Sequence, residues 1–471
     1  MNKKTLFTLK TASQWCGGEY TGDDVDVCSV IIDSRDAIHG EKMMFVALEG
    51  ENTDGHRFIP SALENGANCV LCKQAPSGTN AIIVKDTLRA LGDIAENYKK
   101  QKNVFTVGIT GSVGKTTTKE LAASVFAKKY KTYKTDGNYN SVIGLPLTVF
   151  KIPDDCTATV LEMGMSARGE ISAMAKIACP DTAIITNIGT SHLEMLKTRE
   201  NILRAKLEIA DYFNKDCTLV MNGDDPFLWE YRNEHTAFRK IYAGINNSNA
   251  DFKASNVRNE SACMRFDVYI KAEDRIVSDV VIPAVGIHNV LNAVCVFACA
   301  YNAGIDENSI KEGFLNYKTT GMRQKIYNVG EYTFIADCYN ASPESMRASS
   351  LMLSQMTKEK NVRSHAVLGE MRELGDTAQQ LHMDVGRAMY ENGVDFLYLW
   401  GSNACAIGKG AIESGMPKEN VFMFENGEEY GTLSKAVCSN LEKGDTVLFK
   451  ASRYVRLEEA IENLEGYLKN N

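Results

Sequence analysis

The hydrophobic and polar positions of this chain alternate in a way that predicts short strands separated by amphipathic helices along nearly its whole length. Short apolar runs rich in β-branched residues indicate strands, and apolar residues spaced three or four apart indicate helices. Strands that alternate with helices form parallel sheets with crossover helices, so we expect an α/β fold. Shifts in this pattern predict three domains, over residues 1–102, 103–318 and 319–471.

The first stretch predicts a small N-terminal α/β domain. Its expected strands are short apolar runs bounded by turn residues, at Val30–Ile32, Met44–Leu48, Cys69–Cys72 and Ala81–Val84. Helices are expected over Ile59–Asn65 and Leu88–Lys100, and the polar run that follows the second helix marks a plausible domain boundary.

The second stretch predicts a central, doubly wound parallel sheet of the P-loop ATPase type. An apolar strand begins near Val104, and further strands are expected at Thr159–Leu161, Thr182–Thr186 and Thr218–Met221. The intervening helical patterns lie at Lys115–Lys129, Gly169–Ile177 and Thr198–Phe213. Strict alternation within Asp251–Pro283 predicts an antiparallel extension, and a helix is expected from about His288 to Asn302.

The third stretch repeats the alternation and predicts a C-terminal, Rossmann-like α/β domain. Its expected strands are Tyr332–Ala336, Ala366–Leu368, Phe396–Leu399, Val421–Phe424 and Thr446–Phe449. Because these strands are separated by helical patterns, a second parallel sheet is expected.

The turn from Gly108 to Thr116 carries the strongest chemical signal in the chain. A buried strand, a glycine-rich turn and a helix start together aim backbone N–H groups and the positive helix end at one point, which suits polyphosphate. Lys115 is expected to reach the β- and γ-phosphates and Thr116 to bind Mg²⁺. Strict Walker A spacing would place a glycine at Ile109, so an ordinary glycine-rich turn with an exposed lysine is the alternative.

Composition and charge narrow the functional classes. The 44% hydrophobic and 24% charged content is ordinary for a globular protein, and a net charge of −8 argues against a nucleic-acid-binding surface. No apolar run approaches about 18 residues, so we expect no membrane insertion. The N-terminal residues lack the apolar core of a signal peptide, which predicts a cytoplasmic protein.

The 13 cysteines lie mostly in apolar runs, and we interpret them as buried, reduced thiols. Cys69 and Cys72 have the spacing of metal ligands, but no second pair or nearby histidine completes a zinc site.

Three polar residues near expected strand ends are candidates for catalysis. Glu162 follows an apolar strand, where it can face the phosphate loop and bind Mg²⁺; a solvated strand end is the alternative. His192 lies in a glycine-containing loop and is a candidate ligand or acid–base group, or else a helix cap. Lys206 has apolar helical neighbours, so it is either a surface lysine or a desolvated amine with a shifted pKa.

Two further positions suit nucleotide recognition. Asn289 and Asn292 lie three apart on one helical face, where paired amides can read an adenine edge, although Asn at a helix start also serves as a cap. Asp337 ends a buried strand and is well placed to bond a ribose hydroxyl.

The order of these motifs resembles the Mur ligases, ATP-dependent amide-forming enzymes of peptidoglycan synthesis, over essentially the whole chain. Further motifs are most similar to the branch that joins D-alanyl-D-alanine to UDP-N-acetylmuramoyl-tripeptide. They are Asp33–Arg35, Phe45–Gly50, Asp54–Phe58, Thr135–Asn140, Gly144–Leu147, Tyr339–Pro343 and Leu368–Gly375 with His382.

The resemblance implies roles for residues that the motifs alone leave open. The phosphate loop would be Thr110, Gly111, Ser112, Val113, Gly114, Lys115, Thr116 and Thr117, and this form explains the unusual glycine spacing. Asn289 and Asn292 would contact adenine, while Arg323 and Asp337 would contact the nucleotide from the third domain. The substrate residues would be Ser34 and Arg35 for the uridine-diphosphate end, with Asn138, Asn140, Tyr339 and Asn340.

The resemblance also implies the metal chemistry. Mg²⁺ would be held by Thr116 and Glu162, and a second ion by His192. Lys206 would carry a carbamate whose carboxylate joins the second site. Lys115, Glu162, His192 and Lys206 are therefore the expected catalytic group, and ATP, Mg²⁺ and a carbamylated lysine the expected cofactors.

The chain departs from the family pattern at three places, which read Asn140-Ser141, Ser342-Pro343 and Lys450-Ala451-Ser452-Arg453. These differences concern peptide positioning more than the reaction. The alternatives are a sister ligase that adds the third amino acid, a folylpolyglutamate-type ligase, a P-loop regulatory NTPase or a small-molecule kinase. We expect small-molecule substrates and a monomer.

Overall fold

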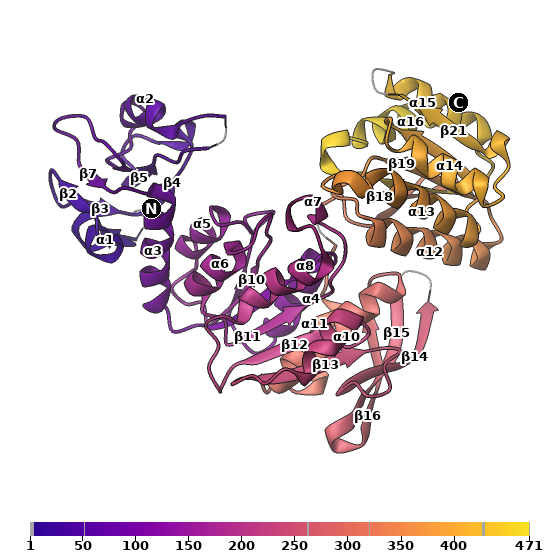
Figure 1. The fold of residues 1–471 in the computed structure, drawn as a ribbon, viewed down its shortest axis with the longest axis horizontal. Coiled ribbons are helices and arrows are strands. Elements are labelled where there is room, and N and C mark those ends of the chain that lie inside the picture. Colours follow the sequence, from indigo (N-terminus) through magenta and orange to yellow (C-terminus); the bar gives the residue numbers. More distant parts are fainter. Residues whose placement is uncertain (1–3, 51, 261–262, 320, 426–428, 471) are drawn as a thin grey trace.

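The computed structural model describes residues 4–50, 52–260, 263–319, 321–425 and 429–470. The chain forms three α/β lobes, each built on its own main sheet, with the first and third lobes standing on either side of the second (Figure 1). The α/β fold with three domains is therefore confirmed. In the part of the chain that the structure describes, no helix has the length and apolarity needed to cross a membrane.

The N-terminal domain contains a five-stranded sheet in the order β2-β7-β6-β5-β4. The strands are β2 (Glu19–Thr21), β4 (Ser29–Ile31), β5 (Met43–Val46), β6 (Cys69–Cys72) and β7 (Ala81–Ile83), all parallel except the β2–β7 pair. A two-stranded sheet pairs β1 (Phe7–Thr8) with β3 (Asp26–Val27). The helices are α1 (Leu9–Cys16), α2 (Ile59–Glu64) and α3 (Thr87–Lys100).

The central sheet has nine strands in the order β16-β15-β14-β13-β12-β11-β8-β10-β9. Its parallel part comprises β8 (Phe105–Thr110), β9 (Thr132–Lys134), β10 (Ala158–Glu162), β11 (Thr182–Ile185), β12 (Thr218–Asn222), β13 (Arg239–Gly244) and β14 (Phe252–Glu260). The strand β15 (Cys263–Ile270) pairs antiparallel with β14, and β16 (Arg275–Ile282) pairs antiparallel with β15, which confirms the predicted extension.

Helices cover both faces of this sheet, as expected for a doubly wound fold. They are α4 (Lys115–Phe126), α5 (Gly144–Phe150), α6 (Glu170–Ala178), α7 (Leu193–Leu196), α8 (Arg199–Leu207), α9 (Pro226–Glu230), α10 (Ile287–Asn302) and α11 (Glu307–Leu315). The helix expected over Thr198–Phe213 is shortened most: α8 ends at Leu207 and a 3₁₀ turn follows. The reason is local, because the Glu208 carboxylate turns to accept from the backbone N–H of Gly169 and Ser172 at the start of α6.

The C-terminal sheet has six strands in the order β17-β18-β22-β19-β20-β21, with only the β17–β18 pair antiparallel. Its strands are β17 (Lys325–Val329), β18 (Tyr332–Asp337), β19 (Ser364–Gly369), β20 (Phe396–Trp400), β21 (Val421–Phe424) and β22 (Thr446–Lys450). Its helices are α12 (Pro343–Lys360), α13 (Ala378–Glu391), α14 (Cys405–Glu413), α15 (Tyr430–Asn440) and α16 (Glu458–Asn470).

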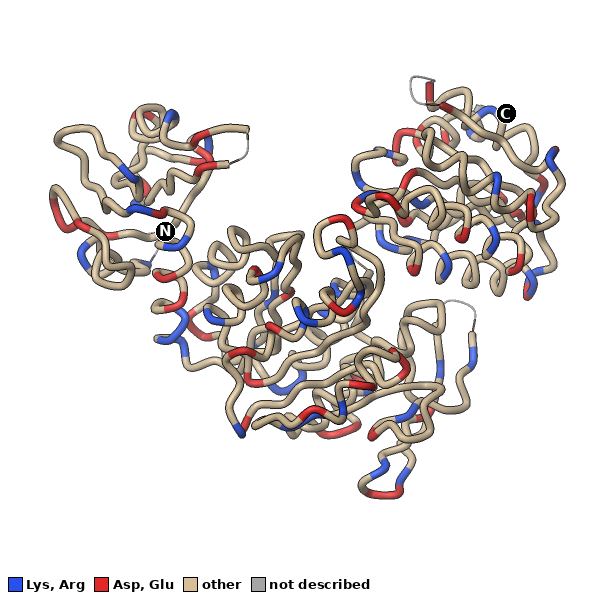
Figure 2. The backbone as a smooth tube through the Cα atoms, in the orientation of Figure 1, with Lys and Arg blue, Asp and Glu red and all other residues tan. Residues whose placement is uncertain are grey.

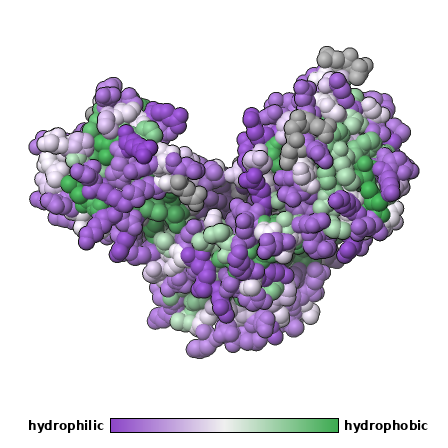
Figure 3. Space-filling view, turned by 45° about the horizontal axis from the view of Figure 1, so that its top comes forward, coloured by the Kyte–Doolittle hydropathy of each residue, from purple (hydrophilic) through white to green (hydrophobic). Residues whose placement is uncertain are grey.

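The outer domains attach to the central one differently. Phe7 and Tyr98 of the N-terminal domain pack on Phe150 of α5 with ring centroids 5.7 and 5.6 Å away, inside one apolar core that both domains share. The C-terminal domain has its own two cores, on either face of its sheet, and among the described residues only Val285 joins them from the central domain. Between the outer lobes the molecule is open, and the surfaces around this notch are largely hydrophilic (Figure 3).

Acidic and basic residues are interspersed along the backbone of all three domains (Figure 2). No disulfide bond joins any of the 13 cysteines, all of which lie within the described residues. Cys69 and Cys72 are both buried in β6, and burial raises the pKa of the Cys72 thiol to about 11.

Candidate functional site

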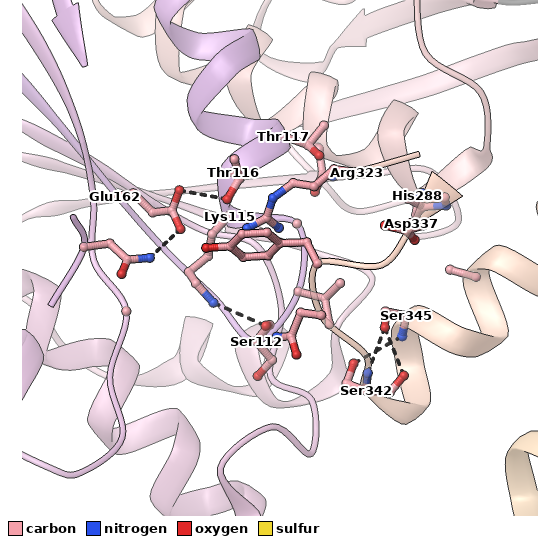
Figure 4. A pocket seen from close by; sticks show the side chains of 18 of the residues that line it. Ser112, Lys115, Thr116, Thr117, Glu162, His288, Arg323, Asp337, Ser342 and Ser345 are labelled. Atoms are coloured by element: carbon pink, nitrogen blue, oxygen red, sulfur yellow. Dashed lines mark hydrogen bonds between the residues drawn. The ribbon is translucent and has the colours of Figure 1, made fainter. Parts of the chain in front are cut away.

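The predicted phosphate loop opens onto a cavity of about 330 Å³ between the central and C-terminal domains (Figure 4). The cavity lies beyond the carboxyl ends of β8, β10 and β18, which is where open parallel sheets bind ligands. From the central domain it is lined by Lys115, Thr116, Glu162, His192, Asn289 and Asn292. From the C-terminal domain it is lined by Arg323, Asp337, Tyr339, Asn340 and Lys450.

Two glycines give the phosphate loop its shape. Gly111 and Gly114 have φ values of +151° and +85°, which residues with side chains rarely adopt. A Cβ at Gly111 would lie 1.8 Å from Thr186 Oγ1, and one at Gly114 would lie 2.9 Å from Asn292 Oδ1. Gly114 also begins α4 without a side-chain cap, so the first N–H groups of the helix stay available to an anion.

Lys115 folds back over the loop. Its Nζ donates to the carbonyl oxygens of Gly111 at 2.8 Å and Ser112 at 3.3 Å. Burial lowers the pKa of Lys115, and the nearby negative charge of Glu162 acts in the opposite direction. An anion in the loop would therefore meet a partly desolvated ammonium group, where electrostatic attraction is stronger than in water.

Thr116 and Glu162 come together as the sequence predicts. Thr116 Oγ1 donates to Glu162 Oε2 at 3.0 Å, and Asn140 Nδ2 donates to the other carboxylate oxygen at 2.8 Å (Figure 4). The Glu162 side chain is only 1% exposed, and Lys119 Nζ lies 3.9 Å from Oε2. A hydroxyl and a carboxylate side by side beneath a phosphate loop fit the oxygen ligands that Mg²⁺ prefers.

His192 lines the same cavity but is engaged by the C-terminal domain. Its Nδ1 lies 2.5 Å from Glu373 Oε2, and Glu194 N–H donates to the Glu373 carbonyl at 3.1 Å. The hydrogen bond from His192 is the main cause of a lowered Glu373 pKa. Glu373 belongs to the Leu368–Gly375 motif, but sequence reasoning did not pair it with His192, because no local pattern links two residues that are so far apart in the chain.

Lys206 is a buried lysine whose charged form is disfavoured by its surroundings. It is only 1% exposed. Burial lowers its pKa well below the usual value, and the positive charge of Lys115 lowers it further. It is not among the residues that line the cavity. A buried amine with a lowered pKa is more often unprotonated, and the unprotonated form is the nucleophile that can be modified.

Asn289 and Asn292 reach the cavity from the first turns of α10, as predicted. Asn289 Nδ2 donates to Val285 O at 2.8 Å and to Gln324 Oε1 at 2.9 Å. Gln324 also contacts His288 Nε2 at 2.8 Å, and burial lowers the pKa of His288 to about 4. The helix itself is not capped by either asparagine, because Gly286 stands at its N-cap.

Asp337 at the end of β18 is held by an ion pair. Lys450 Nζ lies 2.5 Å from Asp337 Oδ2, and Ser349 Oγ donates to the same oxygen at 3.3 Å. Lys450 also donates to Asn340 O at 3.2 Å, which orders the turn after β18. Beside this turn, the Arg323 guanidinium carbon lies 3.9 Å from the centroid of the Tyr339 ring.

Several predicted residues lie outside the cavity lining. Thr110 is buried beneath the loop, where its hydroxyl donates to Met163 O at 2.8 Å. Asn138 is exposed, and Ser34 and Arg35 belong to the N-terminal domain. Arg35 forms an ion pair with Asp33 at 2.5 Å.

A second group of possible metal ligands is Glu49, Asp54 and His56 in the N-terminal domain. Both ring nitrogens of His56 are engaged: Nδ1 lies 2.7 Å from Asp54 Oδ1, and Nε2 accepts from Lys73 N–H at 2.9 Å. The Lys73 ammonium lies 2.6 Å from Glu49 Oε2, so a lysine side chain already pairs with this carboxylate. This group therefore has the character of a hydrogen-bonded cluster.

Comparisons with known proteins agree with these observations. Three family descriptions match successive parts of the chain: Mur ligase family, catalytic domain, over 28–99; Mur ligase middle domain, over 109–300; and Mur ligase, glutamate ligase domain, over 322–453. UDP-N-acetylmuramoyl-tripeptide--D-alanyl-D-alanine ligase of Bacillus subtilis (strain 168) is 36% identical over 430 residues, or 90% of each chain.

Solved structures agree over the same length. A crystal structure of MurF from Acinetobacter baumannii matches with a TM-score of 0.89 at 27% identity and covers 99% of this chain and 100% of its own. MurF ligase from Thermotoga maritima in complex with ADP matches with a TM-score of 0.82 at 27% identity, covering 94% and 98%. From its sequence, its three matched domains and its fold, the chain belongs to the Mur ligase family.

Proposed function

We propose that this protein is the ATP-dependent ligase that joins D-alanyl-D-alanine to UDP-N-acetylmuramoyl-tripeptide. The observation that carries the proposal is the shared cavity, in which the phosphate loop and Glu162 of one domain face Arg323 and Asp337 of another. The similarity to ligases of this name over about nine-tenths of the chain supports the choice of substrates.

The reaction needs an activated carboxylate. The terminal carboxylate of the tripeptide attacks the γ-phosphorus of ATP, and the bond between that phosphorus and the oxygen that bridges to the β-phosphate breaks. ADP departs, and the tripeptide carboxylate is now an acyl phosphate. The amine of D-alanyl-D-alanine then attacks the acyl carbon and loses a proton. The bond from that carbon to the phosphate oxygen breaks, releasing inorganic phosphate as the amide forms.

The proposed roles follow from charge. The attacking carboxylate and the phosphates repel each other, so the site must neutralise negative charge before they can approach. Lys115 and the N–H groups of residues 110–117 would hold the β- and γ-phosphates. Asn289 and Asn292 would contact adenine, while Arg323 and Asp337 would contact the rest of the nucleotide from the C-terminal domain.

Mg²⁺ would add the remaining neutralisation, and the residues present fit it. Thr116 and Glu162 supply adjacent hard oxygen ligands, 3.0 Å apart. His192 suits a second ion on the condition that its ring is released from Glu373. When bound, Mg²⁺ would polarise the phosphoryl group and neutralise charge on the phosphates.

Lys206 would complete the second site as a carbamate. In this proposal its unprotonated Nζ attacks carbon dioxide, forms an N–C bond and loses a proton, which converts a buried cation into an anionic oxygen ligand. Burial and the nearby positive charge of Lys115 support this change, because both disfavour the ammonium form.

Lys206→Ala tests the carbamate. We expect the variant to lose most of its ligase activity and to recover part of it in the presence of short carboxylic acids, which can supply the missing carboxylate. Lys206→Arg, which keeps a cation and cannot be carbamylated, should stay inactive with the same acids. ¹³C NMR with labelled bicarbonate should show a carbamate signal in the wild type alone. Full activity of Lys206→Ala would overturn the carbamate.

The peptide substrate would span all three domains. Ser34 and Arg35 would contact its uridine-diphosphate end, and Asn138, Asn140, Tyr339 and Asn340 would position the peptide toward the cavity. Arg35 would have to exchange its ion pair with Asp33 for the substrate phosphates.

The defining assay measures ATP turnover and product mass together. We expect ADP and phosphate to form only when both UDP-N-acetylmuramoyl-tripeptide and D-alanyl-D-alanine are present, with one new amide product. A phosphorylated acceptor would favour a kinase, and nucleotide hydrolysis without an amide product would favour a regulatory NTPase. Turnover with a single amino acid in place of the dipeptide would favour a sister ligase.

The cellular setting is also part of this proposal. A substrate set of ATP and a UDP-linked precursor suits a cytoplasmic enzyme. Because the cavity is built from one chain, a monomer is sufficient for the reaction.

A further inference from the structure

The first turn of α12 joins the C-terminal domain to a loop of the central domain. This loop, residues 186–190, follows β11, and we call it the β11 loop. Glu344 Oε1 accepts from Thr190 N–H at 2.9 Å and from Thr190 Oγ1 at 3.0 Å. Glu344 Oε2 is buried and has no hydrogen-bond partner among the residues that the structure describes. Both hydrogen bonds described for the Glu344 carboxylate therefore come from Thr190 of the central domain.

The β11 loop in turn holds the phosphate loop. Ser112 N–H donates to Asn187 O at 3.1 Å, and the Asn187 side chain both accepts from Val113 N–H at 2.9 Å and donates to Val113 O at 2.9 Å. Gly189 N–H donates to Ser112 Oγ at 2.8 Å. A continuous set of hydrogen bonds therefore runs from the C-terminal domain to the residues that would cradle phosphate.

Gly189 allows the carboxylate to approach this closely. A Cβ at Gly189 would lie 2.9 Å from Glu344 Cδ, so a side chain there would push the carboxylate away. Glu344 does not line the cavity, so its influence on a nucleotide would pass through the β11 loop.

We propose that Glu344 is a positioning residue, which sets the shape of the phosphate loop through the β11 loop when the C-terminal domain is docked. The proposal rests on the proposed function, because it assigns Glu344 a part in ATP binding by the same site. It makes nucleotide affinity depend on a residue of the opposite domain that does not touch the nucleotide.

The central domain also holds the β11 loop from its own side. Ile188 N–H donates to Asp225 Oδ2 at 2.8 Å, and Arg199 Nε donates to Ile188 O at 3.1 Å. If these two contacts are enough to order the loop, Glu344 is dispensable. The test must therefore measure the loops directly as well as nucleotide binding.

The other end of α12 supplies a matched control. Glu359 Oε1 accepts from Asn259 Nδ2 of β14 at 2.8 Å, which is a second carboxylate contact between the same two domains. The helix lies on the side of the C-terminal domain that is turned toward the central domain (Figure 1). Glu359→Ala removes an interdomain bond of the same kind without touching the β11 loop.

Hydrogen exchange on the full chain, without nucleotide, tests the structural part. In Glu344→Ala we expect faster exchange of the backbone amides in 112–113 and 187–190, with unchanged exchange at those amides in Glu359→Ala. Glu344→Gln keeps the acceptor oxygen and should restore most of the protection. Exchange at wild-type rates in Glu344→Ala would overturn the proposal, and so would equal acceleration in Glu359→Ala.

Equilibrium binding of ATP to the same proteins tests the functional part. We expect the Kd of Glu344→Ala to rise about tenfold and that of Glu344→Gln to rise no more than about threefold. The Kd of Glu359→Ala should match the wild type. ATP binding by the wild type with an unchanged Kd in Glu344→Ala would overturn this inference and leave the proposed function intact. Failure of the wild type to bind ATP would overturn the proposed function itself, while the exchange result would still decide the coupling of the loops.

Discussion

Glu162 is a buried carboxylate whose two oxygens accept hydrogen bonds from different donors, Thr116 and Asn140. Burying a charged carboxylate in this way costs free energy, because water is excluded and the nearest ammonium, that of Lys119, is 3.9 Å away. The two donors orient the carboxylate toward the phosphate loop. The Glu162 carboxylate is therefore already oriented to bind a cation.

Glu162→Gln should therefore separate metal binding from folding. The amide keeps the volume, and the Thr116 hydroxyl can reverse to accept from it, so the thermal unfolding temperature should change little. We expect the variant to need about ten to a hundred times more Mg²⁺ for half-maximal activity. Glu170→Gln, at another lining residue that accepts from Ser166 N–H at 2.7 Å, should keep the wild-type requirement. An unchanged Mg²⁺ titration in Glu162→Gln would remove this residue from the metal site.

At the scale of elements, α13 is tied to the loop that precedes it by one buried histidine. His382 Nε2 accepts from Met371 N–H at 3.0 Å, and Nδ1 donates to Ala378 O at 2.6 Å. This pattern requires the neutral ring, and burial lowers the pKa of His382 below its ordinary value of 6.5. The same loop carries Glu373, which reaches His192 in the central domain.

The stability of the protein should therefore decrease in mild acid in part through His382. The pKa is lower in the folded state than in the unfolded state, so the unfolded state binds more protons once the pH falls below about 6.5. Above that pH the contribution is complete, and it is lost as the pH drops toward the folded-state pKa, by at most about 1.4 kcal/mol per pH unit.

Urea unfolding between pH 7.5 and pH 5 measures this contribution. We expect the free energy of unfolding of the wild type to fall more steeply with acid than that of His382→Gln, whose amide oxygen can accept from Met371 but does not titrate. Two other buried histidines, His288 and His365, remain in both proteins, so the difference between the two curves isolates His382. Parallel curves would contradict the assignment.

Much of this level of structure could be predicted from the sequence, and the exceptions have physical causes. The parallel strands were predictable because they are buried on both faces and read as unbroken apolar runs. Six strands were not predicted. Four of them, β1, β2, β3 and β9, are only two or three residues long, the parallel strand β13 begins with the charged pair Arg239-Lys240, and β17 is a largely exposed edge strand. Thr116 and Glu162 follow adjacent parallel strands, so their meeting was predictable, whereas the partners Glu344 and Glu373 come from domain docking, which leaves no periodic signal.

At the scale of the whole molecule, the three domains are not joined alike. The N-terminal domain shares an apolar core with the central domain, in which Phe150 is buried against Phe7 and Tyr98. The C-terminal domain meets the central domain through polar contacts such as those of Glu344, Glu359 and Glu373. Polar interfaces within a chain are the ones that open and close, so the mobile unit should be the C-terminal domain.

Calorimetry should therefore resolve two unfolding units in the intact protein. We expect the N-terminal and central domains to unfold together and the C-terminal domain to unfold separately. Phe150→Ala, which empties a shared part of the first core, should destabilise only the first unit, by about 3–5 kcal/mol. Leu351→Ala, at an exposed position on α12, should leave both transitions in place. A single transition that moves as a whole in Phe150→Ala would contradict this division.

The same asymmetry predicts which movement accompanies substrate binding. A reactive acyl phosphate must be kept from water, and the domain held to the central one mainly by polar contacts is the one that carries Arg323 and Asp337 into the cavity. ATP would bring negative charge to Lys115 and Arg323 from opposite sides and draw the two domains together. Small-angle scattering should show the radius of gyration falling, on addition of ATP and the UDP-linked tripeptide, toward the value of about 23 Å expected for a compact chain of 471 residues. Lys115→Ala should not contract under the same conditions, because its phosphate loop lacks the cation. An unchanged radius in the wild type, or an equal contraction in Lys115→Ala, would count against closure driven by the nucleotide.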